Sequence, residues 1–221
     1  MTILGFDTST AASTAAVLRS DGELFESVPP PARLAEPPAH ARELLPAVND
    51  VMKRADVGFG ELDAIAVGVG PGTFTGLRIG VATARALAKA NDKPVRGVSS
   101  LAALADGMTA GARLPLIDAK RGEVYAALFD QEEERWAPFV ARIDAVVERL
   151  REAGRTPAAA GDGSLRFRDE LETAGVAVAP AESPSHVVSA GHLCRRARGT
   201  PDVLPEQVVP NYLREPDAVP R

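Results

Sequence analysis

The sequence predicts an α/β protein in which mixed β-sheets are flanked by helices, arranged in two related halves. Three short strand patterns open the chain, and helix and strand patterns then alternate, as in an α/β layer architecture. A second strand pair begins near Arg113, directly after a helix, so the same order starts again. The 221 residues, 45% of them hydrophobic, suffice for one large domain or two small ones. We see no clear sequence repeat, so the duplication is inferred from element order alone.

The first three predicted strands form a meander. Residues 2–6 and 13–19 are short apolar runs, and residues 23–28 form the third strand. Asp21-Gly22 separates the second strand from the third and is a strong signal for a two-residue hairpin turn. The polar residues 7–10 follow the first strand and are expected at the tip of the other hairpin.

Two helices flank a strand in the rest of the first half. Residues 40–55 read as an amphipathic helix, which Pro46 is expected to bend. Residues 64–69 form an apolar strand pattern, and a helix follows at residues 75–90. The apolar positions of the first helix follow the i, i+3, i+4, i+7 rule: Ala41, Leu44, Leu45, Val48, Val51 and Met52.

The remaining elements follow from the same patterns. Strands are expected at residues 95–98, 113–117, 123–129 and 157–160. Helices are expected from a Ser99 or Ser100 cap to about residue 108, and at residues 143–153, 165–174 and 185–198. Ser185 is the expected cap of the last helix. The acidic residues 132–134 are expected to form an exposed turn, and the tail at residues 205–221 is expected to be irregular.

Composition narrows the functional classes. The net charge of -5 argues against a protein that binds nucleic acid through its overall electrostatic field, although a local basic patch is compatible with it. The single cysteine, Cys194, cannot form an internal disulfide, which favours the cytoplasm. The N-terminus has no basic start, and no segment approaches about 18 apolar residues. We therefore expect neither a signal peptide nor a membrane span.

Two loops are candidate phosphate sites. Asp7 and the three hydroxyl residues 8–10 suit a hydrated magnesium ion and a phosphate. A hairpin turn whose side chains bond their own backbone is the simpler account, because the loop lacks a lysine and a second glycine. The glycine-rich residues 68–80 lie between a strand and a helix, the usual frame for backbone amides that bind an anion. Their spacing matches neither the Walker A motif nor the dinucleotide fingerprint.

The glycine-rich segment continues into a ridge of small residues. Gly76, Gly80, Ala84 and Ala88 recur every four positions, along one side of the predicted helix. Such a ridge permits another helix to approach closely. Glycine inside a helix costs about 0.5–1 kcal/mol relative to alanine, so these glycines need a reason. Close packing is the favoured reason, and backbone exposure to a ligand is the alternative.

The other polar candidates are weaker. His40, His186 and His192 lack the spacing of a metal site. His40 fits an interface and a solvated helix start equally well. Asp118 and Glu123 flank a Lys-Arg-Gly turn, where a charged hairpin is a simpler account than an acid/base pair.

Four segments together resemble the TsaB (YeaZ) family. They are ILGFDTST at residues 3–10, GVGPGTFTGLRIG at 68–80, IDAKRGEVYAALF at 117–129 and PNYLRE at 210–215. The matches are collinear and span most of the chain. The two central segments are specific, whereas the tail segment is only supportive. His40 followed by Glu-Leu-Leu-Pro at residues 43–46 fits the same family.

The resemblance implies the actin-like ATPase fold (ASKHA, ribonuclease H-like), with an N-terminal lobe at residues 1–105 and a C-terminal lobe at 106–221. It also implies a role in forming N6-threonylcarbamoyladenosine in tRNAs that read ANN codons, as a non-catalytic partner and activator of the catalytic subunit TsaD. TsaD carries a metal-binding His-x-x-x-His where this chain has Ser100 and Leu104. Neither side chain can act as an imidazole ligand.

The implied partners are TsaD in a heterodimer, TsaE in a ternary complex, and a second copy of the chain when it is alone. ATP is expected to be used by the complex, with no cofactor in the isolated chain, and tRNA is expected to be bound through the complex. Two alternatives are an autonomous ATP-binding enzyme of the same fold and a metalloprotease. The missing His-x-x-x-His counts against the protease.

The implied interface lies on the first two helices of the N-terminal lobe. Its candidate residues are His40, Leu44, Leu45, Val48, Gly76, Leu77, Gly80, Val81, Ala84 and Ala88. The candidate residues of a residual nucleotide loop are Asp7, Thr8, Ser9, Thr10, Gly70 and Gly72. If the small-residue ridge is the interface, Gly80→Leu or Ala84→Trp is expected to abolish association with TsaD and leave the monomer folded.

Overall fold

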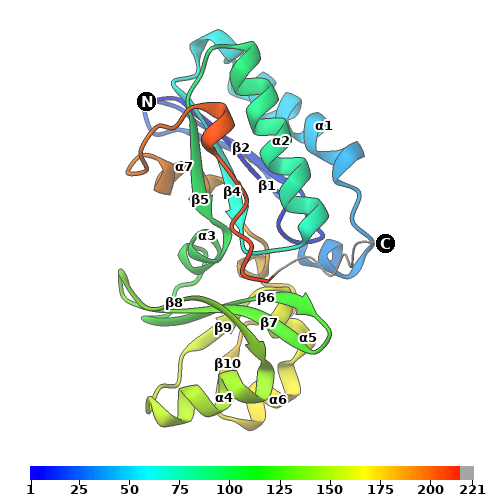
Figure 1. The fold of residues 1–221 in the computed structure, drawn as a ribbon, viewed down its shortest axis with the longest axis vertical. Coiled ribbons are helices and arrows are strands. Elements are labelled where there is room, and N and C mark those ends of the chain that lie inside the picture. Colours follow the sequence, from blue (N-terminus) through cyan, green and yellow to red (C-terminus); the bar gives the residue numbers. More distant parts are fainter. Residues whose placement is uncertain (215–221) are drawn as a thin grey trace.

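The computed structural model describes residues 1–214 and contains two five-stranded sheets, which lie one above the other as two lobes in Figure 1. The first sheet has the order β3-β2-β1-β4-β5. Its strands are β1 (Ile3–Asp7), β2 (Thr14–Leu18), β3 (Leu24–Ser27), β4 (Ala64–Gly70) and β5 (Val95–Ser99). Strands β1, β2 and β3 form the predicted antiparallel meander, whereas β4 and β5 run parallel to β1.

Helices cover both faces of the first sheet. The helices α1 (His40–Arg54) and α2 (Phe74–Ala90) pack on one face, and α3 (Ser100–Asp106) and α7 (Ala190–Ala197) pack on the other (Figure 1). Successive side chains of a strand point to opposite faces. Leu4 and Phe6 of β1 therefore join the core under α1 and α2, while Ile3 joins the core under α7. Burial on both faces explains why β1 reads as a continuous apolar run.

The second sheet repeats the topology of the first. Its order is β10-β9-β6-β7-β8. Its strands are β6 (Ala112–Lys120), β7 (Glu123–Asp130), β8 (Glu133–Arg142), β9 (Ala158–Ala160) and β10 (Ala177–Val178). Its helices are α4 (Ile143–Glu152), α5 (Asp162–Arg166) and α6 (Arg168–Thr173). Read from β8, three antiparallel strands precede two parallel ones, as in the first sheet. The predicted arrangement of two related lobes, each with a mixed sheet flanked by helices, is confirmed.

Three predicted elements are wrong in detail, and the strands β8 and β10 lie where no strand was predicted. The acidic residues 132–134 are not simply a turn, because the turn is complete at Glu132 and Glu133 already begins β8 opposite Asp130. The helix expected at residues 165–174 is divided at Phe167 into α5 and α6. The last helix starts after Ser189, whose hydroxyl accepts a hydrogen bond from the His192 amide at 3.2 Å.

The expected cap of that last helix, Ser185, lies in a separate 3-10 helix at Pro184–His186. The tail also contains a short 3-10 helix, Pro205–Gln207, in the segment that was expected to be irregular. Residues 215–221 of the predicted tail lie outside the described residues.

The first sheet ends with β5 and the second begins with β6, but the end of the chain packs on the first sheet. The α7 helix packs on β1 and β2 of the first sheet, where Leu193 and Cys194 are fully buried. Beyond it, Val203 pairs with Val95 at the edge of β5. The apolar face of α7 is buried mainly against the first sheet, so the end of the chain belongs to the first lobe. Within residues 1–214, no helix has the length and apolar character needed to cross a bilayer.

Residues 203–214, which we call the C-terminal strap, run along α2 and then reach the second lobe. The Arg85 guanidinium on α2 donates hydrogen bonds to the carbonyl oxygens of Val208 at 2.9 Å and Glu206 at 3.2 Å. The Asn211 amide donates to the Val69 carbonyl at 2.7 Å. Arg214 forms an ion pair with Glu123 of β7 at 2.6 Å. The strap therefore links α2, β4 and the second sheet.

The contact between β1 and α7 gives a test of this packing. A Cβ atom at Gly5 would lie 2.5 Å from the Cys194 sulfur, so we expect Gly5→Ala to lower the free energy of unfolding by about 1–3 kcal/mol. Removing that sulfur with Cys194→Ala should recover part of the loss. Urea unfolding of the single and double variants measures the coupling. An equal cost of Gly5→Ala in both backgrounds would contradict the contact.

Candidate functional site

The predicted nucleotide loop after β1 is closed upon itself. Asp7 Oδ1 accepts hydrogen bonds from the Ser9 amide at 2.8 Å and the Ser9 hydroxyl at 2.6 Å. Asp7 Oδ2 accepts a hydrogen bond from the Ser100 hydroxyl of α3 at 2.7 Å. Burial raises the pKa of Asp7, although these hydrogen bonds oppose the shift. The carboxylate is fully engaged inside the protein, and all of residues 7–10 are buried.

The glycine-rich turn presses directly onto this loop. A Cβ atom at Gly72 would lie 2.4 Å from the Ser9 carbonyl oxygen, and one at Gly76 would lie 2.0 Å from the Thr8 carbonyl oxygen. The Thr73 amide donates to the Ser9 carbonyl at 2.7 Å. The Thr8 hydroxyl donates to the Gly76 carbonyl at 2.8 Å. The two loops are therefore brought together as predicted, but they bind each other.

This closed arrangement does not fit a nucleotide phosphate. A phosphate bound between the loops needs free amides and space, whereas here backbone meets backbone. Gly70, the remaining glycine of the predicted loop, has φ 105° and packs against Leu77 rather than facing an opening. We derive no reaction step through a nucleotide at this site.

The small-residue ridge of α2 faces inward, which corrects its predicted role as a docking surface. A Cβ atom at Gly80 would lie 2.4 Å from the Thr8 hydroxyl oxygen, and Ala84 and Ala88 are fully buried in the core beside β4. The ridge lets α2 lie close to the chain's own sheet. Gly80→Leu or Ala84→Trp is therefore expected to disrupt the monomer, contrary to the expectation from the sequence.

Nine of the ten predicted interface residues are buried within the monomer. They are His40, Leu44, Val48, Gly76, Leu77, Gly80, Val81, Ala84 and Ala88. Only Leu45, at 49% exposure, lies on the surface. The apolar periodicity used to choose these residues identifies the side of a helix that packs on its own sheet. The opposite sides of α1 and α2 are the ones that face solvent.

His40 is part of a buried hydrogen-bond network and not a solvated helix start. Its Nδ1 lies 2.9 Å from the Ser13 hydroxyl. On the solvent side of this pair, Arg33 binds the Glu43 carboxylate with contacts of 3.0 to 3.1 Å. Burial lowers the pKa of His40, and the nearby Asp7 and Glu43 carboxylates oppose that shift. The network joins the start of α1 to the β1–β2 loop.

The outward side of α2 carries the residues that the sequence argument missed. Phe74, Arg78, Ala82 and Ala86 recur every four positions and are exposed. We call them the outward stripe of α2. Phe74 is 37% exposed and lies under the Arg78 guanidinium, whose central carbon is 4.3 Å from the ring centroid. The sequence could have indicated this exposed side of α2, because its four residues also recur every four positions.

The outward stripe forms one wall of an apolar groove, and the C-terminal strap forms the other. The groove has a volume of about 820 Å3. Val209 and Tyr212 of the strap are 60% and 40% exposed. The Tyr212 ring lies 5.2 Å from the Phe74 ring, centroid to centroid. Four of the exposed large apolar residues therefore lie on α2 and the strap: Phe74, Leu204, Val209 and Tyr212.

A charged cluster at the β6–β7 turn is structural. Asp118 accepts hydrogen bonds from the Lys120 ammonium at 2.8 Å and from Arg166 at 2.8 and 2.9 Å. Burial alone would raise the pKa of Asp118, but these partners hold it below its ordinary value. Glu123 pairs instead with Arg214. The charged-hairpin interpretation fits this geometry better than an acid/base pair.

Asp162 lies next to this charged cluster. Its Oδ1 accepts a hydrogen bond from the Asp118 amide at 3.0 Å. Burial raises the pKa of Asp162 to about 6, and the negative charge of Asp118 adds to the shift. The position thus holds a carboxyl group that titrates near neutral pH.

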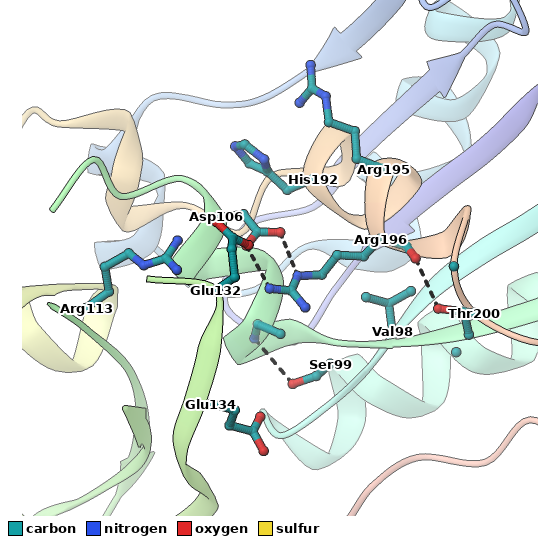
Figure 2. A pocket seen from close by; sticks show the side chains of 13 residues that line it. Val98, Ser99, Asp106, Arg113, Glu132, Glu134, His192, Arg195, Arg196 and Thr200 are labelled. Atoms are coloured by element: carbon teal, nitrogen blue, oxygen red, sulfur yellow. Dashed lines mark hydrogen bonds and ion pairs between the residues drawn. The ribbon is translucent and has the colours of Figure 1, made fainter. Parts of the chain in front are cut away.

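A polar cleft of about 840 Å3 opens between α3, α7 and the β7–β8 turn (Figure 2). Figure 2 shows Arg196 of α7 directed at Asp106 of α3, with hydrogen bonds of 2.6 and 2.7 Å to the two carboxylate oxygens. Burial lowers the pKa of His192 in the same cleft. The bidentate pair ties the two helices together on the face of the sheet opposite to α1 and α2.

Comparison with known proteins decides the family. TsaB of Escherichia coli K12, described as a tRNA threonylcarbamoyladenosine biosynthesis protein, is 31% identical over 228 residues, which cover 97% of this chain and 95% of the relative. The chain belongs to the TsaB family. The crystal structure of YeaZ from Pseudomonas aeruginosa superposes on this TsaB-family chain with a TM-score of 0.78, at 33% identity, and covers 96% of this chain and 99% of its own.

Two further comparisons show how far the similarity to known proteins extends. The family model for TsaD, tRNA N6-adenosine threonylcarbamoyltransferase, matches residues 34–168. An uncharacterised protein of Mycobacterium tuberculosis H37Rv is 37% identical over 221 residues, which cover 99% of this chain and 94% of the relative. The TsaB-family similarity therefore extends over both lobes.

The closed loops of this TsaB-family chain can be tested with one glycine. We expect Gly76→Ala to lower the free energy of unfolding by at least about 2 kcal/mol, because its Cβ atom would meet the Thr8 carbonyl oxygen. Gly60→Ala is the matched control, since a Cβ atom there meets nothing within 4 Å. Denaturant unfolding measures both. Equal, small effects would mean that α2 does not rest on the β1–β2 loop.

The titration of Asp162 predicts a pH-dependent stability. Its folded pKa of about 6 lies above the ordinary value of 3.8, so its contribution to the free energy of unfolding is fully present below about pH 4 and is lost as pH rises through 6. Asp162→Asn keeps an acceptor for the Asp118 amide and removes the charge. We expect the free energy of unfolding of this variant to exceed that of the wild type by about 1–3 kcal/mol at pH 8 and to match it near pH 4. A constant difference across urea titrations at these pH values would contradict this.

Proposed function

We propose that this chain is a non-catalytic accessory subunit that binds and activates a TsaD-type catalytic subunit in the formation of threonylcarbamoyladenosine in tRNA. The carrying observation is that the β1–β2 loop, which is a phosphate loop in ATPases of this fold, is filled by its own side chains and by the first turn of α2. The name of the E. coli relative supports the pathway. The TsaD-type family model supports kinship with the catalytic subunit.

The residues that replace catalytic groups support a non-catalytic role. The resemblance places Ser100 and Leu104 where TsaD carries its metal-binding histidines. The Ser100 hydroxyl donates to Asp7, and Leu104 packs in the core beneath α7. Neither side chain offers a ligand with the properties of imidazole. Within residues 1–214, no cluster of three or more His, Cys, Asp or Glu side chains is placed to bind a metal.

The exposed apolar residues support a docking role. Leu45 of α1, the outward stripe of α2 and the C-terminal strap all lie on the layer that covers one face of the first sheet. Exposed apolar surface of this kind marks a site of protein association. Leu45 is the one residue of the predicted interface that this proposal retains, and the outward stripe replaces the buried ones.

The remaining parts of the proposal follow from the same role. ATP is used by the assembled complex, of which TsaE is the third member, and tRNA is reached through that complex in the cytoplasm. The isolated chain carries no cofactor. An autonomous ATP-dependent enzyme would need the contacts of Thr8 and Ser9 with α2 to open.

A reconstitution assay tests the role. We expect the TsaD-type protein of the same organism, with its TsaE-type protein, ATP and the threonylcarbamoyl donor, to modify tRNA at least tenfold faster when this chain is added. Mass spectrometry of digested tRNA measures the product. Calorimetry should detect no binding of ATP and magnesium by the isolated chain.

Two results would count against this function. Modification that is equally fast without the chain would remove its activating role. Stoichiometric, tight binding of ATP by the isolated chain would favour the autonomous enzyme instead.

A further inference from the structure

We propose that the tip of the β6–β7 hairpin in the second lobe contacts the phosphate backbone of the tRNA directly. We call residues 119–122 the hairpin tip. This inference rests on the proposed function, which makes tRNA the substrate of the complex, and it adds a contact that this chain itself makes. The hairpin tip belongs to the second sheet and not to the helices that cover the first one.

The backbone of the hairpin tip has an uncommon conformation. Lys120 and Arg121 have φ angles of 63° and 56°, and Gly122 follows with φ 81°. Glycine adopts this left-handed region without steric cost, whereas a residue with a Cβ atom does not. Within residues 1–214, Lys120 and Arg121 are the only two consecutive residues other than glycine with a positive φ. Two cationic side chains held in such a conformation point to a function of the side chains themselves.

A set of hydrogen bonds fixes this conformation. The Asp118 carboxylate accepts a hydrogen bond from the Lys120 amide at 2.9 Å and another from the Lys120 ammonium at 2.8 Å. Arg166 of α5 donates to both oxygens of the same carboxylate at 2.8 and 2.9 Å. The Asp118 amide is held in turn by Asp162 at 3.0 Å. The hairpin tip is therefore ordered before any ligand arrives, which lowers the entropic cost of binding.

The cations of this cluster reach solvent, whereas the carboxylate that they share is buried. The side chains of Lys120 and Arg166 are 65% and 43% exposed, and that of Asp118 is 6% exposed. Both cationic groups have more donors than one shared carboxylate can accept. The Arg142 guanidinium also lies beside the turn, 3.9 Å from the position of a Cβ atom on Gly122. The surface at the hairpin tip therefore offers N–H donors and positive charge.

The surroundings of the hairpin tip favour RNA over an acidic protein as the ligand. Within residues 1–214, no large apolar side chain between Phe74 and Leu204 is exposed. A protein interface needs an apolar core, whereas contacts to a phosphate backbone need only donors and charge. Because the chain carries a net charge of -5, its contact with RNA has to be local. A rigid turn that presents lysine and arginine meets these conditions.

Neutralising the hairpin tip tests the RNA contact. We expect Lys120→Gln/Arg121→Gln to raise the Kd for tRNA at least about fivefold, in the complex of this chain with the TsaD-type protein. The slope of log K against log salt concentration should become shallower by about 1–2, as for lost phosphate contacts. Arg195→Gln/Arg198→Gln is the control, because it removes the same charge from two exposed positions at the end of α7. Fluorescence anisotropy with labelled tRNA measures both. Equal Kd values and slopes for the two variants would overturn the contact.

Relieving the backbone conformation tests the role of Arg121 independently of folding. Arg121→Gly places glycine at φ 56°, so we expect the urea midpoint of this variant to be no lower than that of the wild type. Its affinity for tRNA in the complex should nevertheless fall at least about threefold. Arg121→Lys keeps the charge and should bind tRNA like the wild type. Unchanged tRNA affinity of Arg121→Gly would mean that Arg121 does not contact RNA.

The outcomes separate this inference from the proposed function. If the variants of the hairpin tip bind tRNA like the wild type and the chain still stimulates modification, the RNA contact fails and the accessory role stands. If they lose affinity for the TsaD-type protein in calorimetry, the hairpin tip is a protein contact and the inference is overturned. Binding of ATP to the isolated chain that Lys120→Gln/Arg121→Gln abolishes would reassign the hairpin tip to a free nucleotide. A wild-type chain that does not stimulate tRNA modification would overturn the proposed function, on which the inference rests.

Discussion

The backbone contact between the first turn of α2 and the β1–β2 loop determines most of the functional surface. Gly72 and Gly76 allow α2 to rest on the carbonyl groups of Ser9 and Thr8, at distances that a side chain would prevent. The contact fills the space that a phosphate between the two loops would need. It also sets the rotation of α2 about its axis, and with it the residues that reach solvent. The close approach of α2 to the β1–β2 loop therefore closes the predicted nucleotide site and exposes the outward stripe of α2.

As a result, one side of α2 packs on the sheet and the other side faces solvent. The inward side carries small residues because it lies close to β4 and to Thr8, and its cost in helix propensity is offset by that packing. The outward side carries Phe74, Arg78, Ala82 and Ala86, and the C-terminal strap lies beside it. Because Arg85 binds strap carbonyl groups, the strap is held as a wall of the groove. The groove depends on segments more than 100 residues apart in the sequence.

The second lobe contains a comparable close contact between a glycine-containing turn and the backbone. The turn between β9 and α5 occupies the place that the turn between β4 and α2 has in the first lobe. Gly161 has φ 106°, and a Cβ atom there would lie 2.0 Å from the Leu116 carbonyl oxygen of β6. In both lobes a glycine-containing turn meets the backbone of the first strand or the loop that follows it. The duplication thus extends from strand order to a specific backbone contact.

The sequence by itself determined the antiparallel meander that opens the first sheet, the hairpin of β6 and β7 and the extent of α1 and α2, because these depend on local periodicity and turn signals. It also determined the family, through motifs that are contiguous in the chain. Only the tertiary structure decided that the ridge from Gly76 to Ala88 faces its own sheet, that α7 belongs to the first lobe and that β8 begins at Glu133. A run of small residues indicates that something approaches closely, but it does not say what. That answer depends on contacts between Thr8 and Gly76, which are 68 residues apart and meet only when the sheet has formed.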